Sequence, residues 1–489
     1  METSTLILMI IFVFTFVPLF LAEVARKKAL PTLSDFFLQG RKMSLLMVFF
    51  TVYTTWMSIF AFLGASGYFY SRGPVYMTTI AWDALFGLLF FVFGERIWAY
   101  GKLNGYITPR DFFNDIFGSK LLNAVMTFVM LVFTMIYLQI QFSGGAFVIE
   151  IASGGRIPWQ MAGFIFYLII IIYLWAGGIR AVALADIFYG ILLFVSMVFI
   201  GFFLISKSGG ITATFEEIVL INELHVILPG PDGDAGELLW ICMFITVPFG
   251  AIMGPQIWIR MYAVGSRKTF SIMPLFLCLV AIQCFGTVFA GSAAIILKGD
   301  ALEPDKVIPL ALLEHAGPVL CAILFCGITS AALSTANSQI HASAAIYTID
   351  IHKRYINPNA SEKHLVAVAK WAVLGFSVVA YLFLVRSPSL IIETGTMALG
   401  GTAQVIIPTA GALFWERSHP NAASTGLTVG ITTLIFLFFF STMSPVYSTV
   451  IALIINGGIF VFLSMFLEKD IKTSNKISGY KEAYKSYRI

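Results

Sequence analysis

Apolar runs long enough to cross a membrane recur along the whole chain and restrict its fold more than any other feature. A helix needs about 20 residues to span about 30 Å of hydrocarbon. Thirteen such runs lie near residues 5–22, 43–71, 74–98, 121–150, 158–176, 181–206, 237–262, 271–297, 308–348, 365–385, 389–415, 423–441 and 446–467. Only 11% of the 489 residues are charged, against about a quarter in soluble domains. The sequence therefore predicts an all-α polytopic membrane protein.

The basic residues predict how these spans are oriented. Most of the 30 Lys and Arg residues fall in alternate loops, whereas the longest loop on the other side, 207–236, carries acidic residues. Basic loops stay in the cytoplasm. We therefore expect a multi-pass plasma-membrane protein with its N-terminus outside and its C-terminus in the cytoplasm. The net charge of +4 comes from basic residues at the cytoplasmic ends of the spans and in the tail. We therefore expect these residues to face a lipid bilayer and not a nucleic acid.

Two of the runs carry signs of a broken helix. The seventh contains two prolines and two glycines between Thr246 and Pro255, and the second contains a polar segment, 51–58, followed by Gly64 and Gly67. On the predicted topology these two runs cross in opposite directions. Interrupted helices at matching places in two inverted halves indicate a transporter's binding site, although a simple kink explains either one alone.

This correspondence predicts one membrane domain without soluble modules. We expect a leading helix at 5–22, a first five-helix repeat at 43–206 and an inverted second repeat at 237–415. Two trailing helices would follow at 423–467, and a cytoplasmic tail at 468–489.

The ninth run contains an unusually polar stretch from Ser330 to Gln339. At 3.6 residues per turn, Ala331, Ser334, Thr335 and Ser338 share one helix face, with Asn337 beside Ser334. Hydroxyl and amide groups in hydrocarbon are costly without partners. Neighbouring helices, water or a bound ion would each supply those partners.

Asp83 and Asp186 lie well inside predicted spans. A buried carboxylate is a candidate functional residue, because burying it unpaired costs several kcal/mol. The predicted topology places no Lys or Arg at comparable depth, so a bound cation is the expected countercharge. A protonated Asp that hydrogen bonds to a carbonyl is the alternative.

Four separated motifs resemble those of the sodium/solute symporter family. They are the Gly-Gly-x-x-Ala-Val-x-x-x-Asp pattern at 177–186, the segment 37–41, Pro255-Gln256 followed by Arg260, and Ala331-x-x-Ser-Thr. The resemblance covers essentially the whole chain in order. It implies about 13 transmembrane helices with a leucine-transporter-like core of five plus five inverted helices, one leading helix and two trailing helices.

The resemblance also implies a principal sodium site where two core helices meet. Its ligands would be the backbone carbonyls of Thr54, Met57 and Ala331 and the hydroxyls of Ser334 and Thr335. Hard oxygen donors suit a hard cation, and carbonyls become available where a helix breaks.

A second sodium site, present in some members, would use Asp186, Ser334, Asn337 and Ser338. Asn337 stands where two-sodium members carry a hydroxyl residue, so the second ion stays open.

For the solute, the resemblance favours small monocarboxylates and related organic acids, because residues 53–64 are similar to that branch. Proline-transporting relatives carry an acidic residue where this chain has Trp56. The side chains expected to face the solute are Thr55, Ser58, Gln139, Gln256 and Gln404, with Tyr137 and Gln141 as further candidates. Hydrogen bonding between helices is the alternative role for each.

We therefore predict a sodium-coupled secondary symporter that imports a small organic solute by alternating access. It would be no enzyme, would use Na+ as its only cofactor and would need no obligate protein partner. A proton-coupled symporter using Asp186, a carrier of amino acids, sugars or vitamins, and a sodium-responsive sensor are the alternatives. Two intramembrane aspartates, Asp83 and Asp186, are also compatible with an intramembrane aspartyl protease. Neither the Tyr-Asp nor the Gly-x-Gly-Asp motif of those proteases is present, however.

Overall fold

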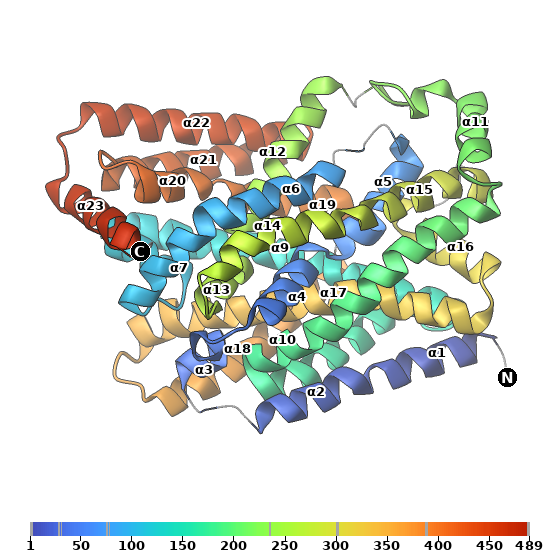
Figure 1. The fold of residues 1–489 in the computed structure, drawn as a ribbon, viewed down its shortest axis with the longest axis horizontal. Helices are drawn as coiled ribbons and strands as arrows, with labels where there is room; N and C mark the ends of the chain where they lie inside the picture. Colours follow the sequence, from blue (N-terminus) through green and yellow to red (C-terminus); the bar gives the residue numbers. More distant parts are fainter. Residues whose placement is uncertain are drawn as a thin grey trace.

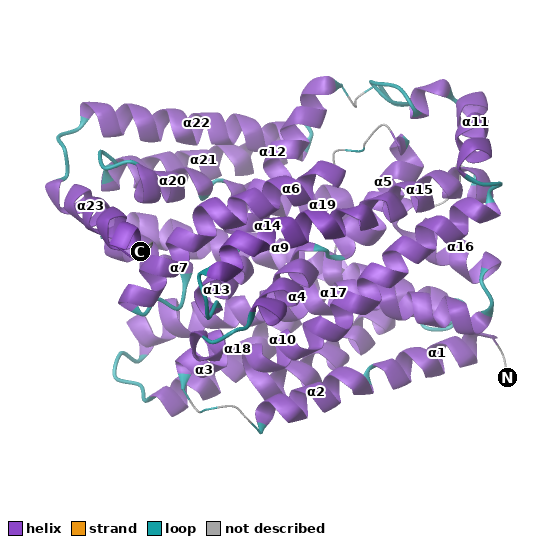
Figure 2. Cartoon of the chain, in the orientation of Figure 1, coloured by secondary structure: helices purple, strands orange, loops and turns teal. Residues whose placement is uncertain are grey.

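The computed structural model describes residues 3–27, 30, 32–74, 77, 79–233, 236–299, 303–386 and 390–486, without the side chains of 173–177. Within these ranges the chain is a bundle of long helices joined by loops and forms no β-strand (Figure 2). Helices α1 and α2 lie along one edge of the bundle and α21 and α22 along the opposite edge (Figure 1). The predicted all-α membrane fold is confirmed.

The helices follow one another along the whole chain. They are α1 (Thr3–Phe14), α2 (Phe16–Arg26), α3 (Leu33–Leu38), α4 (Leu45–Trp56), α5 (Ala65–Arg72), α6 (Thr79–Leu89), α7 (Glu95–Asn104), α8 (Pro109–Phe117), α9 (Lys120–Ala152), α10 (Trp159–Lys207), α11 (Ile211–Ile221), α12 (Glu237–Met253), α13 (Pro255–Ala263), α14 (Lys268–Val280), α15 (Cys284–Lys298), α16 (Val307–His315), α17 (Pro318–Ile346), α18 (Glu362–Arg386), α19 (Ile391–Ala403), α20 (Ile406–Phe414), α21 (Pro420–Phe440), α22 (Pro445–Phe466) and α23 (Ile471–Ser486). Shorter turns include the π-helical η2 (Phe60–Gly64), η4 (Phe90–Gly94) and η8 (Tyr347–Ile356), and the 3-10 turn η7 (Pro304–Lys306).

Helix is present at every predicted span. By length and hydropathy alone, nine of the described helices are able to cross a membrane, or up to 11 when each of two bent pairs counts as one span. The third predicted span, α6 to α7, carries Asp83, Glu95 and Arg96, and the part of the fifth with described side chains includes the apolar helix Trp159–Ile172. One predicted run, 308–348, is divided between α16 and α17, because Gly317 and Pro318 start a new helix there.

Both predicted helix breaks are present. Helix α4 and the η2–α5 segment are bent by 52°, and α12 and α13 by 56°. Pro255 has no N–H to donate and begins α13, which separates it from α12 at Gly254. At the first break Met57, with ψ of 76°, ends α4. Each break exposes backbone groups inside the bundle.

Helix α17 forms the centre of the bundle. In its most apolar part, 83% of the residues are buried. The helix packs against α4, α9, α10 and α13 (Figure 1). Gly178, with φ of +55°, joins the two membrane-crossing parts of α10. A Cβ atom there would lie 2.9 Å from the carbonyl oxygen of Phe36. The Gly-Gly motif therefore permits a turn that other residues would strain.

Candidate functional site

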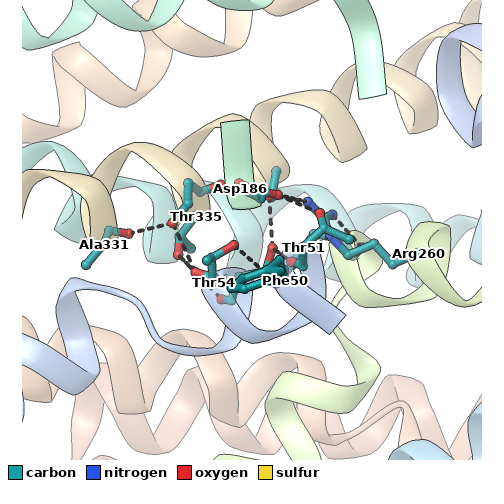
Figure 3. A network of polar contacts seen from close by, with 11 residues as sticks. Phe50, Thr51, Thr54, Asp186, Arg260, Ala331 and Thr335 are labelled. Carbon is teal, nitrogen blue, oxygen red and sulfur yellow. Dashed lines mark hydrogen bonds and ion pairs between the residues drawn. The ribbon is translucent and has the colours of Figure 1, made fainter. Parts of the chain in front are cut away.

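The polar face of α17 meets the broken end of α4. Thr54 would normally accept a hydrogen bond from the amide of Ser58, but that amide donates instead to the carbonyl of Trp56, at 3.0 Å. The carbonyl of Thr54 accepts from the hydroxyl of Ser334, at 3.1 Å. It also accepts from the hydroxyl of Thr335, at 3.0 Å (Figure 3). The helix break thus supplies the acceptor that these two hydroxyls need inside the bundle.

Hydrogen bonds join four of the five residues predicted as ligands of the principal sodium site, namely Thr54, Ala331, Ser334 and Thr335. Ser334 also donates to the carbonyl of Ala331, at 3.3 Å. Met57 is the first non-helical residue after α4. All five residues are buried, with Met57 at 3% and the other four at 0% exposure. Carbonyl and hydroxyl oxygens of this kind are the donors that a hard cation prefers.

A buried arginine pairs with Asp186, which corrects the expectation that no basic side chain lies at this depth. Nη2 of Arg260 lies 3.6 Å from Oδ2 of Asp186, and the two side chains are 1% and 0% exposed. The hydroxyl of Thr51 donates to the same oxygen at 2.5 Å. Nε of Arg260 donates to the carbonyl and the hydroxyl of Thr51, at 3.0 and 2.9 Å (Figure 3). Hydropathy placed Arg260 at the cytoplasmic end of a span, whereas α13 is the second half of a broken helix.

The same arginine occupies part of the predicted second sodium site. Nη2 of Arg260 donates to the hydroxyl of Ser338, which donates in turn to the carbonyl of Ser334 at 2.7 Å. Asn337 is fully buried, and its amide has no hydrogen-bond partner among the described residues. Asp186 and Ser338 are therefore brought together by a guanidinium group, and Asn337 is outside their network.

The residues predicted to face the solute have hydrogen-bond partners in different parts of the bundle. The hydroxyl of Ser58 hydrogen bonds to that of Tyr137 at 2.8 Å. Thr55 donates to the carbonyl of Thr51 at 2.6 Å and lies 3.0 Å from the hydroxyl of Ser338, so it belongs to the arginine network. The side-chain carbonyl of Gln141 accepts from the amide of Ile59, at 3.3 Å, and so satisfies a backbone group freed by the first break.

The three other predicted glutamines do not line the cavity described below. Gln404 donates to the carbonyl of Thr449 at 3.2 Å and accepts from Asn456 at 2.9 Å through its own backbone carbonyl. It therefore packs against α22, which matches the alternative role in helix–helix hydrogen bonding. Gln139 and Gln256 are each 7% exposed, and the backbone carbonyl of Gln256 accepts from Arg260 at 3.0 Å.

A small cavity of about 20 Å³ lies beside the first break. Aromatic side chains form much of its wall, and small or apolar residues complete it: Trp56, Phe60, Trp82 and Tyr137, then Met57, Ala61, Ala65, Val247, Cys284, Thr287 and Leu399. Of the predicted solute residues, Tyr137 lines it and Ser58 hydrogen bonds to Tyr137. The aromatic residues of α6 were missed from the sequence, although Trp82 directly precedes an intramembrane aspartate.

Asp83 lies next to this cavity, and its hydrogen-bond partners differ from those of Asp186. Its carboxyl accepts from the indole N–H of Trp56 and lies 3.6 Å from the thiol of Cys284. Asp186 has Thr51 and Arg260 as partners instead. Within the described residues no hydrogen bond joins the two carboxyls, whereas the dyad of an aspartyl protease shares a proton between them.

His341 contacts the backbone carbonyl of Phe36 at 3.1 Å, as expected of a structural histidine. Across the described part of the chain, no three His, Cys, Asp or Glu residues lie close enough to hold a metal ion together.

A comparison with protein families matches residues 36–430 to the model described as the sodium:solute symporter family. The chain belongs to this family. The osmoregulated proline transporter OpuE of Bacillus subtilis is similar, with 24% identity over 92% of this chain and 93% of its own length. The sodium/pantothenate symporter of Escherichia coli is 25% identical over 83% of this chain and 84% of its own.

Solved structures support the same fold for this symporter-family chain. An outward-open, substrate-bound Na+-coupled sialic acid symporter superposes with a TM-score of 0.81 at 18% identity, over 96% of this chain and 99% of that one. Mhp1, a transporter of the nucleobase-cation-symport-1 family, superposes with a TM-score of 0.60 at 13% identity, over 91% and 97% of the two chains. The leucine-transporter-like fold is therefore confirmed.

Proposed function

We propose that this chain is a sodium-coupled secondary active symporter that imports a small organic acid, such as a monocarboxylate, by alternating access. Its family and fold are those of sodium-coupled transporters. The single observation that carries the proposal for this chain is the meeting of Ser334 and Thr335 with the open carbonyl of Thr54.

In the proposed mechanism sodium binds at this junction of α4 and α17. The ion replaces hydrogen bonds in which the hydroxyls of Ser334 and Thr335 donate to Thr54, and takes the carbonyls of Met57 and Ala331 as further ligands. Because it contacts both helices, it favours the state in which the cavity beside the break is formed. Sodium and solute then each raise the affinity for the other by the same factor.

The solute carboxylate would bind near the break instead of at an arginine. Arg260 is already held by Asp186, Thr51 and Ser338. The sodium ion and the N-terminal end of the helix dipole of the η2–α5 segment supply positive potential. Proline and pantothenate, named for two relatives, each carry a carboxylate. For Asp186 and Ser338 we favour a structural role with Arg260 over a second sodium site.

We place the N-terminus outside and the C-terminus in the cytoplasm of the plasma membrane. Helix α1 begins at the end of the bundle that carries α11, and α23 lies at the other end (Figure 1). This agrees with an acidic outer loop at 207–236. The two bent pairs support inverted repeats at 43–206 and 237–415, with 5–22 leading, 423–467 trailing and a tail from 468 to 489.

The test compares two hydroxyls on one helix in proteoliposomes. Ser334→Ala should raise the sodium concentration for half-maximal uptake at least tenfold, because a ligand is lost. Ser330→Ala is the matched control, since among the described residues its hydroxyl bonds to the carbonyl of Cys326 on its own helix, at 2.8 Å. Candidate solutes are first found by sodium-dependent thermal shift with acetate, pyruvate, lactate, pantothenate, amino acids and sugars.

Equal sodium dependence in both variants would refute the sodium site. Uptake driven by a pH gradient without sodium would instead support the proton-coupled alternative.

A further inference from the structure

The C-terminal helix α23 lies at one end of the bundle, where it packs on α7, α8 and α20 (Figure 1). Its buried side chains include Thr473, Ile477 and Tyr484, and Tyr480 is partly buried between the last two. These positions are three or four residues apart and so form one stripe along the helix. Although α23 is mostly polar, it is therefore docked on the bundle along most of its length.

The N-terminal half of α23 is bonded to α8. Nζ of Lys476 lies 2.6 Å from Oδ1 of Asp115 and donates to the backbone carbonyl of the same residue at 2.5 Å. The Asp115 carboxyl also accepts from the hydroxyls of Tyr480 and, at 2.5 Å, of Tyr106. Burial alone would raise the pKa of Asp115, but these three donors outweigh it and lower the pKa. The carboxyl is therefore ionised at neutral pH, and Lys476 is its countercharge.

The C-terminal half of α23 contacts α7 and the second repeat. The ring of Tyr484 lies 4.8 Å from the guanidinium carbon of Arg96 on α7 and 5.7 Å from that of Arg267, directly before α14. Nζ of Lys481 lies 2.9 Å from Oε1 of Glu416, beyond the end of α20. Cation–π contacts and partly exposed ion pairs are each weak. One helix carries them all, however, so they act together.

The partners of α23 belong to two groups of helices. Helix α7 packs on α13, the second half of the broken seventh span, and Glu95 of α7 forms an ion pair with Arg267. Helix α8 packs mainly on α9, which in turn packs on α17 and α18. In carriers with broken helices, access alternates when one group of helices moves against the other around a fixed site. A helix bonded to both groups resists this motion at the end where it lies.

We propose that α23 is an autoinhibitory clamp that holds this end of the carrier closed. The clamp is formed by Lys476, Tyr480, Lys481 and Tyr484. The inference rests on the proposed function, because it needs a carrier that opens at its two ends in turn; the proposed topology makes this the cytoplasmic end. The side chains of the two ion pairs are between 27% and 43% exposed, so dissolved salt reaches and screens them. A higher ionic strength at this face therefore loosens the clamp.

The experiment measures the opening of this end in the full chain in nanodiscs without sodium. Spin labels are placed at Ser266→Cys, in the loop before α14, and at Lys120→Cys, at the start of α9. Both positions are exposed, and the exposed Cys278 is replaced by Ser. The distance between the labels reports the separation of the two groups of helices. Lys476→Ala combined with Tyr484→Ala should increase the population at the longer distance at least threefold.

Two matched controls should keep the distances of the wild type. Tyr484→Phe retains the ring beside the two guanidinium groups, and Lys485→Ala removes an exposed lysine of the same helix. Asp115→Asn weakens the clamp from α8 instead, and it should increase the longer-distance population at least twofold if the double variant does not fold.

A salt titration separates a clamp from a merely structural helix. Raising choline chloride from about 0.05 M to about 0.5 M should increase the longer-distance population of the wild type but not that of the double variant, since screening acts on the ion pairs of the clamp. Wild-type distances in the double variant, or an equal effect of salt on both proteins, would overturn the inference. Sodium-dependent uptake is still present in those cases, whereas its absence for every solute would count against the proposed function itself.

Discussion

The pairing of Arg260 with Asp186 makes a quantitative prediction about stability. At 3.6 Å and an effective dielectric constant of about 20, two unit charges attract by about 5 kcal/mol. Removing one partner of a buried pair typically costs about 3–5 kcal/mol, because the other charge is left uncompensated. Asp186→Asn and Arg260→Gln should therefore each destabilise the protein strongly. The double variant should be less destabilised than the sum of the two, since it leaves no buried charge.

A double-mutant cycle measures this coupling. Reversible unfolding of the wild type, the two single variants and the double variant in mixed micelles should give a coupling free energy of at least about 2 kcal/mol. Asp35 and Arg180 supply the control cycle. Their side chains are 2.7 Å apart but 6% and 20% exposed, so solvent screening should make their coupling smaller.

Additive effects within about 0.5 kcal/mol would refute the pairing. A second readout then identifies what Asp186 binds. If sodium stabilises the wild type but no longer stabilises Asp186→Asn, while Arg260→Gln still responds to sodium, the carboxylate is an ion ligand. If both variants keep the response of the wild type, neither residue is needed for the ion.

Two further predictions concern the scaffold. A Cβ atom at Gly286 would lie 2.2 Å from the carbonyl oxygen of Met197, so Gly286→Ala should lower Tm by several degrees, whereas Gly375→Ala, with open space around the new methyl group, should not. Burial raises the pKa of Asp305 to about 7, although the backbone amide of Ile391 opposes this. The pKa of an aspartate in the unfolded chain is about 3.9. The contribution of Asp305 to stability is therefore fully present below that pH, and it is lost as the pH rises through about 7. In Asp305→Asn the Tm should change less across this range.

The helices were predictable because hydrocarbon imposes a length and an apolar composition on each span. The second break was predictable in detail, since Gly254 and Pro255 stop one helix and start the next. The first break has neither residue at Met57 and Ser58. Only its polarity and its correspondence with the other half indicated it. The division between α16 and α17 was missed although Gly317 and Pro318 marked it.

The site was harder to predict, because hydropathy reports the depth of a backbone and not the reach of a side chain. Arg260 belongs to a segment read as a cytoplasmic end, yet its long side chain extends to Thr51 and Asp186. Gln404 shows the opposite case. Its position in the eleventh predicted span indicated contact with the solute. In the structure its side-chain amide donates to α22 instead, so its direction depends on how α22 packs. The contact of Ser334 and Thr335 with α4 was predictable, since a motif and a helix face agreed.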